Sequence, residues 1–204
     1  MRDTRHTDTA RPMNDTTRFD RNANIVLVGM PGAGKSTVGI ILAKLAARNF
    51  VDTDVLIQIR EQCTLQDIVD SEGHMSLRAT EERAILDLHC ERHVIATGGS
   101  AAYSPAAMEH LRSNGIVVFL DVPFKMVEMR ISNLATRGIA RRADQTLRDL
   151  FDERHPLYVK YADVHIECGA LAQEPLAELL CRRLGREFPA LGLGGASVER
   201  REHV

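Results

Sequence analysis

The residues best suited to chemistry lie in a glycine-rich segment, GMPGAGKST, that runs from Gly29 to Thr37. Its spacing fits G-x-x-x-x-G-K-[ST], and it stands between an apolar run at residues 25–28 and a helical pattern. Glycines of this kind let backbone N–H groups turn toward phosphate oxygens, and the helix adds the positive end of its dipole. The lysine would reach the β- and γ-phosphates, and the hydroxyl after it would bind Mg²⁺. We therefore predict a nucleoside triphosphate site at Gly32, Ala33, Gly34, Lys35, Ser36 and Thr37, with Ser36 as a magnesium ligand and Lys35 as a catalytic residue.

Three other interpretations of this segment are weaker. A glycine turn with an incidental lysine would not need a strand before it and a helix after it. A dinucleotide fold uses the spacing G-x-G-x-x-G and has no Lys-Ser pair at the helix start. A GTPase needs an N-K-x-D motif, which the sequence lacks, and the loose D-x-x-G match at residues 70–73 does not replace it.

A pair of aspartates, Asp52 and Asp54 in FVDTD, follows a short apolar run at residues 50–51. Alternation would place both on one side of an extended segment, at the carboxyl end of a strand, where open α/β sheets bind ligands. One carboxylate could support Mg²⁺ while the other accepts a proton from an attacking hydroxyl. VVFLD, which ends at Asp121, also looks like a metal-binding strand end. We interpret Asp121 as a capping or solvent-facing residue, because the aspartate pair lies closer to the expected site.

Short apolar runs alternate with helical patterns through the chain, and these are the elements that must position the site. Strands are predicted at residues 25–28, 50–51, 93–96, 116–120 and 164–167. Helices are predicted after the glycine-rich segment, from the capping residues Thr64, Ser104 and Thr146, and at residues 176–184, with Gly115 closing the helix that Ser104 begins. This alternation predicts an α/β protein with a parallel sheet covered on both faces.

Composition limits the class of protein and of partner. The 204 residues are 44% hydrophobic, and 26 Lys and Arg face 28 Asp and Glu, so the net charge of −2 gives no case for nucleic acid or an anionic membrane. No apolar run approaches the ~20 residues of a membrane span, and the polar N-terminus does not resemble a secretory signal. The four scattered cysteines suggest reduced thiols. We expect a cytoplasmic monomer that binds a small molecule.

The two ends of the chain contain few residues that could be buried. We predict a disordered N-terminal tail at residues 1–22 and a flexible C-terminal tail at residues 186–204. One kinase domain would then occupy residues 23–185.

Five motifs in order resemble those of the shikimate kinases: GMPGAGKST, FVDTD, EGHMSLRATEE, ATGGS and ERHPLY. The resemblance covers residues 24–184, and the combination of D-x-D, L-R-x-x-E and R-x-P-L-Y makes it specific. It implies a nucleoside-monophosphate-kinase-like P-loop fold with three layers, a five-stranded parallel sheet, flanking helices and a mobile lid at about residues 136–146.

The resemblance also implies roles for individual residues. Asp54 would bind and activate the substrate hydroxyl, and Asp52 would support Mg²⁺. Arg78 and Arg154 would pair with the substrate carboxylate, whose planar shape matches a guanidinium fork, and Glu81 would hold Arg78 in place. The remaining substrate contacts would come from the turn after the third strand, at Gly98, Gly99 and Ser100.

The lid arginine is less defined, because TRGIARRADQ replaces the usual R-P-L-L of the family. Arg137 is the first choice as a catalytic and ATP-binding residue, Arg141 is the second, and Arg142 is also available. In the acceptor region, Ser100 replaces a third glycine, His74 follows Gly73 in place of a glutamate, and Leu77 replaces a phenylalanine.

The expected function is transfer of the γ-phosphate of ATP, with Mg²⁺, to a hydroxyl of a small carboxylate-bearing metabolite. Shikimate is the first choice by resemblance, giving shikimate 3-phosphate in aromatic amino-acid biosynthesis. The alternatives are a kinase of homoserine or another small hydroxy acid, and a nucleotide-binding module without catalysis. The last is disfavoured because such a module has no need for Asp54, Arg78 and Arg154 together.

Overall fold

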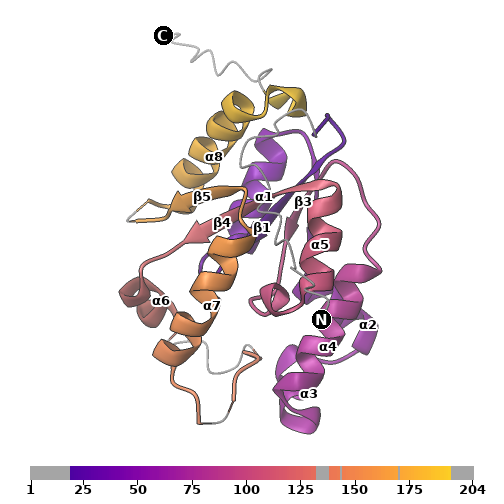
Figure 1. The fold of residues 1–204 in the computed structure, drawn as a ribbon, viewed down its shortest axis with the longest axis vertical. Helices are drawn as coiled ribbons and strands as arrows, with labels where there is room; N and C mark the ends of the chain where they lie inside the picture. Colours follow the sequence, from indigo (N-terminus) through magenta and orange to yellow (C-terminus); the bar gives the residue numbers. More distant parts are fainter. Residues whose placement is uncertain (1–18, 132–137, 143, 170, 194–204) are drawn as a thin grey trace, which may run out of the picture.

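A five-stranded parallel sheet forms the centre of the molecule. The computed structural model describes residues 19–131, 138–142, 144–169 and 171–193 (Figure 1). The strands are β1 (Asn24–Val28), β2 (Asn49–Asp52), β3 (His93–Ala96), β4 (Gly115–Asp121) and β5 (Val164–Glu167). They lie in the order β2-β3-β1-β4-β5, and each neighbouring pair is parallel. The predicted α/β class and the five-stranded parallel sheet are confirmed.

Helices cover both faces of this sheet (Figure 1). Their bounds are α1 (Lys35–Leu45), α2 (Thr53–Glu61), α3 (Leu65–Glu72), α4 (His74–Leu86), α5 (Pro105–Ser113), α6 (Phe124–Ile131), α7 (Leu147–Tyr161) and α8 (Gln173–Glu187), with 3₁₀ turns η2 (Ala101–Tyr103) and η3 (Pro189–Leu191). Helices α1 and α8 pack together on one face, while α5 and α7 contact β4 from the other. The central strand β1 is buried along its length, as a parallel strand between two helical layers should be.

Local capping signals place three of the helix starts. The Thr64 hydroxyl accepts a hydrogen bond from the Asp67 N–H at the start of α3, and Thr146 makes the equivalent bond at the start of α7. Ser104 caps α5, with Pro105 in its first turn. Gly115 does not close α5 as predicted, because that helix ends at Ser113 and Gly115 already pairs with Asn24 as the first residue of β4.

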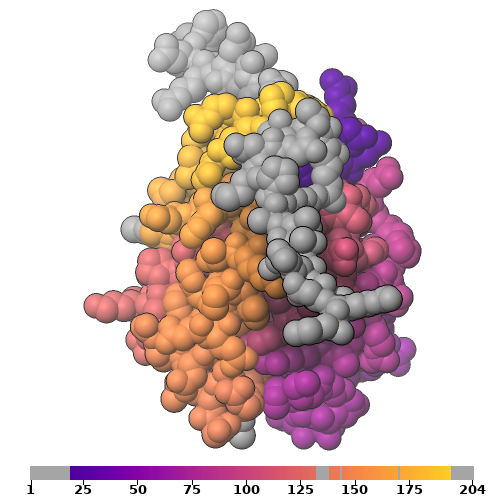
Figure 2. Space-filling model, viewed as in Figure 1, coloured from indigo at the N-terminus to yellow at the C-terminus, as the bar shows by residue number. Residues whose placement is uncertain are grey.

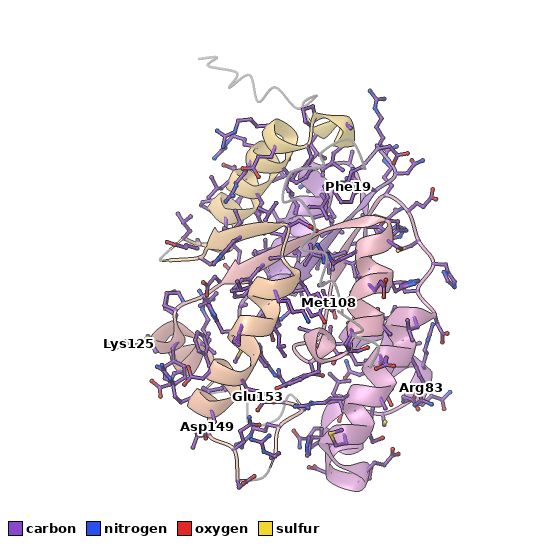
Figure 3. All side chains as sticks on the ribbon, in the orientation of Figure 1. Phe19, Arg83, Met108, Lys125, Asp149 and Glu153 are labelled. Atoms are coloured by element: carbon purple, nitrogen blue, oxygen red, sulfur yellow. The ribbon has the colours of Figure 1, made fainter. Side chains whose placement is uncertain are left out.

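Both ends of the domain extend further than the sequence suggested. Phe19 and Phe188 are buried and meet edge to face, with ring centroids 5.9 Å apart, and Figure 3 places Phe19 beside the end of α8. Arg48 donates hydrogen bonds to the carbonyl oxygens of Ala23 and, at 3.2 Å, of Leu191.

The predicted tail boundaries therefore need correction. Residues 19–22 and 186–193 belong to the packed domain, whereas residues 1–18 and 194–204 lie outside the described part of the chain. The contacts involve isolated apolar residues such as Leu191 and Leu193, which create no helical or strand period that a sequence pattern could reveal.

The expectations about membrane spans and about the cysteines can be compared with the described residues. None of their helices is long and apolar enough to cross a membrane. The four cysteines are free thiols, with Cys168 buried and the others partly buried, as the scattered spacing predicted.

Candidate active site

A cavity of about 380 Å³ opens where the glycine-rich segment meets the acidic and basic side chains predicted to act on substrate. It lies beyond the carboxyl ends of the strands, the usual binding edge of an open parallel sheet. The predicted residues that line it are Gly32, Gly34, Lys35, Ser36, Thr37, Asp54, Glu81, Gly99, Ser100 and Arg154. Segments that are far apart in the sequence are thus brought to one place.

The glycine-rich segment turns sharply between β1 and α1. Gly29 has φ of +146°, and a Cβ there would come within 2.8 Å of the Leu120 carbonyl oxygen. Gly34 has φ of +94° and precedes α1, so no side chain caps the first turn of that helix. The first N–H groups of a helix have no partner within the helix and can bind an anion, which is the role that the sequence predicted for phosphate, although the Ala33 N–H donates to the Met30 carbonyl oxygen at 3.0 Å.

Lys35 lies at the floor of the cavity and is 8% exposed. Its ammonium group donates to the carbonyl oxygens of Gly29 and Met30, at 2.8 and 3.0 Å. Burial lowers the pKa of Lys35 to about 8, although the nearby carboxylates of Asp54 and Glu81 oppose the shift. The lysine is therefore mostly charged at neutral pH and lies beside the glycine-rich segment.

Asp52 and Asp54 differ from the predicted extended pair. Asp52 ends β2 and its carboxylate accepts a 2.9 Å hydrogen bond from the Asp54 N–H, so Asp54 lies in the first turn of α2. The alternation argument was wrong because Asp52 caps α2, a helix that the sequence analysis did not predict. Asp54 lines the cavity and Asp52 supports it from behind. Burial, with repulsion from Asp52, raises the pKa of Asp54 to about 6.

Glu81 comes from α4 and is 3% exposed. Ser100 donates a short hydrogen bond to Glu81 Oε2, while Oε1 has no hydrogen-bond partner among the described residues. Burial and repulsion from Asp54 raise the pKa of Glu81 to about 7. A Cβ on Gly98 would collide with Glu81 Oε1 and come within 2.6 Å of Asp54 Oδ1, so only glycine leaves room for both carboxylates.

Of the two arginines predicted to bind the substrate carboxylate, Arg154 lines the cavity and Arg78 does not. Arg154, on α7, is 1% exposed, lines the cavity and donates a 2.6 Å hydrogen bond to the Ala140 carbonyl oxygen. Arg78, on α4, stacks on Tyr103 with its Cζ 3.5 Å from the ring centroid, and its Nη2 lies 3.8 Å from Glu153 Oε1.

The predicted pairing of Glu81 with Arg78 is not found. Arg78 pairs with Glu153, and Glu81 pairs with Ser100. The two residues are three apart on α4, which makes them neighbours without forcing a bond between them. The serine that replaces the family's third glycine supplies a hydroxyl that binds the glutamate.

The predicted lid lies only partly within the described residues. Arg137 is outside them. Arg141 donates a 2.6 Å hydrogen bond to the Gln145 carbonyl oxygen, and Arg142 forms an ion pair with Glu153 at 3.4 Å. The described part of the lid also contacts α3, because the Gly138 N–H donates to Gln66 Oε1 at 2.9 Å.

Several functional candidates were missed by the sequence. Arg130, on α6, lines the cavity and donates a 3.2 Å hydrogen bond to the Gly32 carbonyl oxygen, so a second cation besides Lys35 reaches the glycine-rich turn. Tyr103 and Glu153 contact Arg78, and Tyr103 also contacts Arg154. The available signal for Arg130 was a basic residue in the last turn of the helix that follows the apolar strand β4. Nothing in the sequence spacing singles out Tyr103.

Asp121, interpreted from the sequence as a capping or solvent-facing residue, is instead half-buried and contacts two histidines. Its Oδ2 lies 3.2 Å from His155 Nε2 and 2.8 Å from His165 Nε2, and it does not line the cavity. It joins the end of β4 to α7 and β5.

Comparisons with known proteins agree with this arrangement. A family model described as Shikimate kinase matches residues 31–184. The chain belongs to the shikimate kinase family. It is therefore an ATP-dependent small-molecule kinase whose acceptor is an alcohol group. The predicted resemblance is confirmed.

Individual relatives of this shikimate kinase family member cover most of its length. A shikimate kinase of Acinetobacter baylyi is 38% identical over 167 residues, which are 80% of this chain and 93% of that protein. One from Thiobacillus denitrificans is 35% identical and covers 81% and 92% of the two chains. A solved structure of the Acinetobacter baumannii shikimate kinase in complex with shikimate has a TM-score of 0.73 and 33% identity, and the match covers 83% of this chain and 96% of that one.

Proposed function

We propose that this kinase transfers the γ-phosphoryl group of ATP to a hydroxyl of shikimate and yields shikimate 3-phosphate, a step of aromatic amino-acid biosynthesis. One observation carries the proposal: Lys35, Asp54 and Arg154 line a single cavity, which gives that cavity a phosphate site, a base and a carboxylate site. Its curated relatives are named shikimate kinases, and one similar structure contains shikimate.

The nucleotide would bind with its phosphates against the turn from Gly29 to Thr37. The N–H groups of this turn and the first turn of α1 would bind phosphate oxygens, and Lys35 would exchange its two backbone carbonyl partners for the β- and γ-phosphates. Arg130 would add a positive charge on the same side.

The donor set fits Mg²⁺. Within the described residues, no cluster of three or more His, Cys, Asp or Glu side chains could hold a metal by itself. Mg²⁺ needs fewer protein ligands than that, because it keeps several waters and binds substrate phosphates directly. The Ser36 hydroxyl and the Asp52 carboxylate are hard oxygen donors of the preferred kind, with Ser36 as the direct ligand and Asp52 as its support. When bound, the ion would offset the negative charge of the phosphates.

Asp54 would act as the base. As the acceptor oxygen attacks the γ-phosphorus, its proton passes to Asp54, the new P–O bond forms and the bond to the β-phosphate oxygen breaks, leaving ADP. The raised pKa of Asp54 suits this role, since a base with a pKa near working pH holds the proton more readily than an ordinary aspartate.

The acceptor's carboxylate would bind to Arg154 and Arg78. Nε and Nη2 of Arg78 are buried and have no hydrogen-bond partner among the described residues. These two atoms form one edge of the guanidinium group, which matches the two oxygens of a carboxylate. Gly98 and Gly99 would let the acceptor ring approach, and Ser100 with Glu81 would form the wall behind it.

The lid assignment keeps its order: Arg137 as the catalytic arginine that covers the nucleotide phosphates, with Arg141 second. Closure of the lid would exclude water, which otherwise competes with the acceptor for ATP. A monomeric enzyme in the cytoplasm likewise stays a prediction from composition.

Homoserine is the second candidate acceptor, because it also carries a carboxylate and a hydroxyl. The observation that favours it is the Ser100–Glu81 hydrogen bond, which changes the acceptor wall where the family has a third glycine.

A coupled ADP-release assay over shikimate, homoserine, gluconate and nucleoside monophosphates tests the proposal. Shikimate should stimulate ADP release strongly, and the other compounds should leave the rate near the ATPase background. Stimulation by homoserine alone would replace shikimate as the acceptor. A rate that no acceptor raises would contradict the kinase activity itself.

A further inference from the structure

The two arginines assigned to the acceptor's carboxylate share one aromatic ring. Tyr103 is the last residue of η2, and η2 packs between α4 and α7, the helices that carry Arg78 and Arg154. The Cζ atom of Arg78 lies 3.5 Å from the ring centroid of Tyr103, and that of Arg154 lies 5.3 Å from it. Guanidinium groups at such distances are attracted by the electron-rich face of the ring.

The hydroxyl group of Tyr103 adds directional bonds. It donates to Glu153 Oε1 at 2.6 Å and accepts from Arg154 Nε at 3.4 Å. Burial and the bond to Glu153 raise the pKa of Tyr103, which keeps the hydroxyl protonated as a donor. Glu153 lies on α7 where this helix faces α4, and it also accepts a 2.6 Å hydrogen bond from Gln145 Nε2 (Figure 3). The ring is therefore held at its hydroxyl end while its face remains available to the arginines.

We infer that Tyr103 is a positioning residue that holds Arg78 and Arg154 in place for the acceptor's carboxylate. This inference rests on the proposed function, which assigns that carboxylate to the two arginines. Of these three residues only Arg154 lines the cavity, and the contacts of Tyr103 are with the two arginines, so Tyr103 would act through them. Tyr103 comes five residues after Gly98. The glycine turn that would approach the acceptor and the residue that would hold the two arginines therefore belong to one short segment.

The Tyr103 ring offsets the electrostatic repulsion between Arg78 and Arg154. Two guanidinium groups that converge on one carboxylate repel each other while the site is empty. The ring face attracts both cations without carrying a charge of its own, so it does not compete with the acceptor as a carboxylate would. Glu153 supplies one balancing negative charge beside Arg78, at 3.8 Å, a distance that leaves the Nε and Nη2 edge of Arg78 without a hydrogen bond.

The test separates the ring from the hydroxyl. Tyr103→Phe keeps the stacking surface and loses both hydroxyl bonds, whereas Tyr103→Leu loses the aromatic face as well. We expect KM for shikimate to rise about threefold in the phenylalanine variant and about tenfold in the leucine variant, while KM for ATP stays within about twofold of wild type. Tyr161→Phe, at a buried tyrosine near the end of the same helix α7, is the matched control and should change neither KM.

A second measurement distinguishes positioning from simple packing. In an Arg78→Met background, Tyr103→Leu should change KM for shikimate by a smaller factor than it does alone, because one of the two arginines attracted by the ring face is already gone. A purely structural role would instead raise KM for shikimate and KM for ATP by similar factors, or would give equal factors in the two backgrounds. Either result would overturn the inference, and the phenylalanine variant decides the question if the leucine variant does not fold.

The wild-type protein in the same assay keeps the two proposals apart. If it phosphorylates shikimate and both Tyr103 variants match it, the positioning role is wrong and the proposed function stands. If it neither phosphorylates nor binds any acceptor that carries a carboxylate, both proposals fail. If homoserine is the acceptor, the same ratios should be measured with homoserine, because the inference concerns the carboxylate.

Discussion

The phosphate side and the acceptor side of the cavity are built in different ways. The proposed phosphate side is one continuous segment, from Gly29 to Thr37, in which mainly backbone N–H groups of the turn would bind the phosphates. The acceptor side is assembled from side chains on α2, α4, η2 and α7, with a glycine turn between them. Figure 2 shows the surfaces of α7 and of α2 to α4 adjoining in the lower half of the molecule. A local motif can therefore specify the first side, whereas only the tertiary fold completes the second.

The two sides also differ in electrostatic cost. On the phosphate side, Lys35 is the main buried charge, and it is bound by backbone carbonyl groups. On the acceptor side, Asp54, Glu81 and Arg154 are brought together out of water, and the two carboxylates repel each other. The surrounding fold holds these three charged side chains together, which lowers the free energy of unfolding, as is typical of catalytic sites.

The largest expected effects are losses of kcat, and they should be accompanied by weaker ATP binding only when the variant lies on the phosphate side. Asp54→Asn removes the base and should lower kcat by about 10²–10⁴-fold while ATP still binds with near-normal affinity. Lys35→Met should also lower kcat by about 10²–10³-fold, and it should weaken ATP binding by about tenfold or more, because its charge contacts the phosphates before and during transfer. Steady-state kinetics and ATP titration measure both.

Lys44→Met is the control for the lysine variant, because Lys44 is exposed at the far end of α1. It should match wild type in both assays. Near-normal turnover of Asp54→Asn would remove Asp54 as the base, and unchanged ATP binding by Lys35→Met would remove the lysine from the nucleotide site.

The same division explains what the sequence could predict. The glycine-rich segment and its helix were predicted in full, because turn and chemistry lie within nine residues. The sheet followed from short apolar runs. Helix α2, which begins at Thr53, was missed because a capping aspartate and a strand residue look alike in sequence. Partners of Arg78 could not be predicted, because Tyr103 and Glu153 reach it only through the packing of α4, η2 and α7.

The next largest effect falls on the acceptor side alone. Arg78→Met removes a charged fork from the carboxylate site and should raise KM for shikimate by about 10–100-fold, with KM for ATP within about twofold. Arg78→Lys should give an intermediate value, since it keeps the charge and loses the paired geometry. Arg83→Met, on the same helix at a residue whose guanidinium bonds Thr80, is the control and should leave both constants unchanged. Equal changes in both KM values would place Arg78 outside the acceptor site.

A third effect concerns stability and depends on pH. The pKa of Asp54 in the folded protein is raised to about 6, so the folded state binds its proton more tightly than the unfolded state does. The contribution of Asp54 to stability should therefore be fully present below about pH 4 and be lost as the pH rises through about 6. Asp54→Asn cannot titrate and should be more stable than wild type at pH 8 by about 1–3 kcal/mol, with a smaller difference at pH 5.

Urea unfolding of both proteins at pH 5 and pH 8 measures this difference. Asp144→Asn is the control: its side chain is 88% exposed, where solvent screens the charge, so its stability relative to wild type should stay constant. A stabilisation by Asp54→Asn that is equal at both pH values would mean that the buried charge is not its cause.

The smallest expected effect tests the position at which this chain departs from its family. Ser100 donates the hydrogen bond that favours the charged form of Glu81, so its loss should raise the pKa of Glu81 further. In both Ser100→Gly and Ser100→Ala, we expect KM for shikimate to rise by about two- to fivefold and the acidic limb of kcat/KM to move to higher pH. The control Ser76→Ala breaks a serine–glutamate hydrogen bond at the surface, to Glu72, and should change neither. If the glycine variant instead bound shikimate more tightly and the alanine variant did not, the Ser100 side chain would be an obstacle to the acceptor, and the acceptor wall would be adapted to a smaller hydroxy acid.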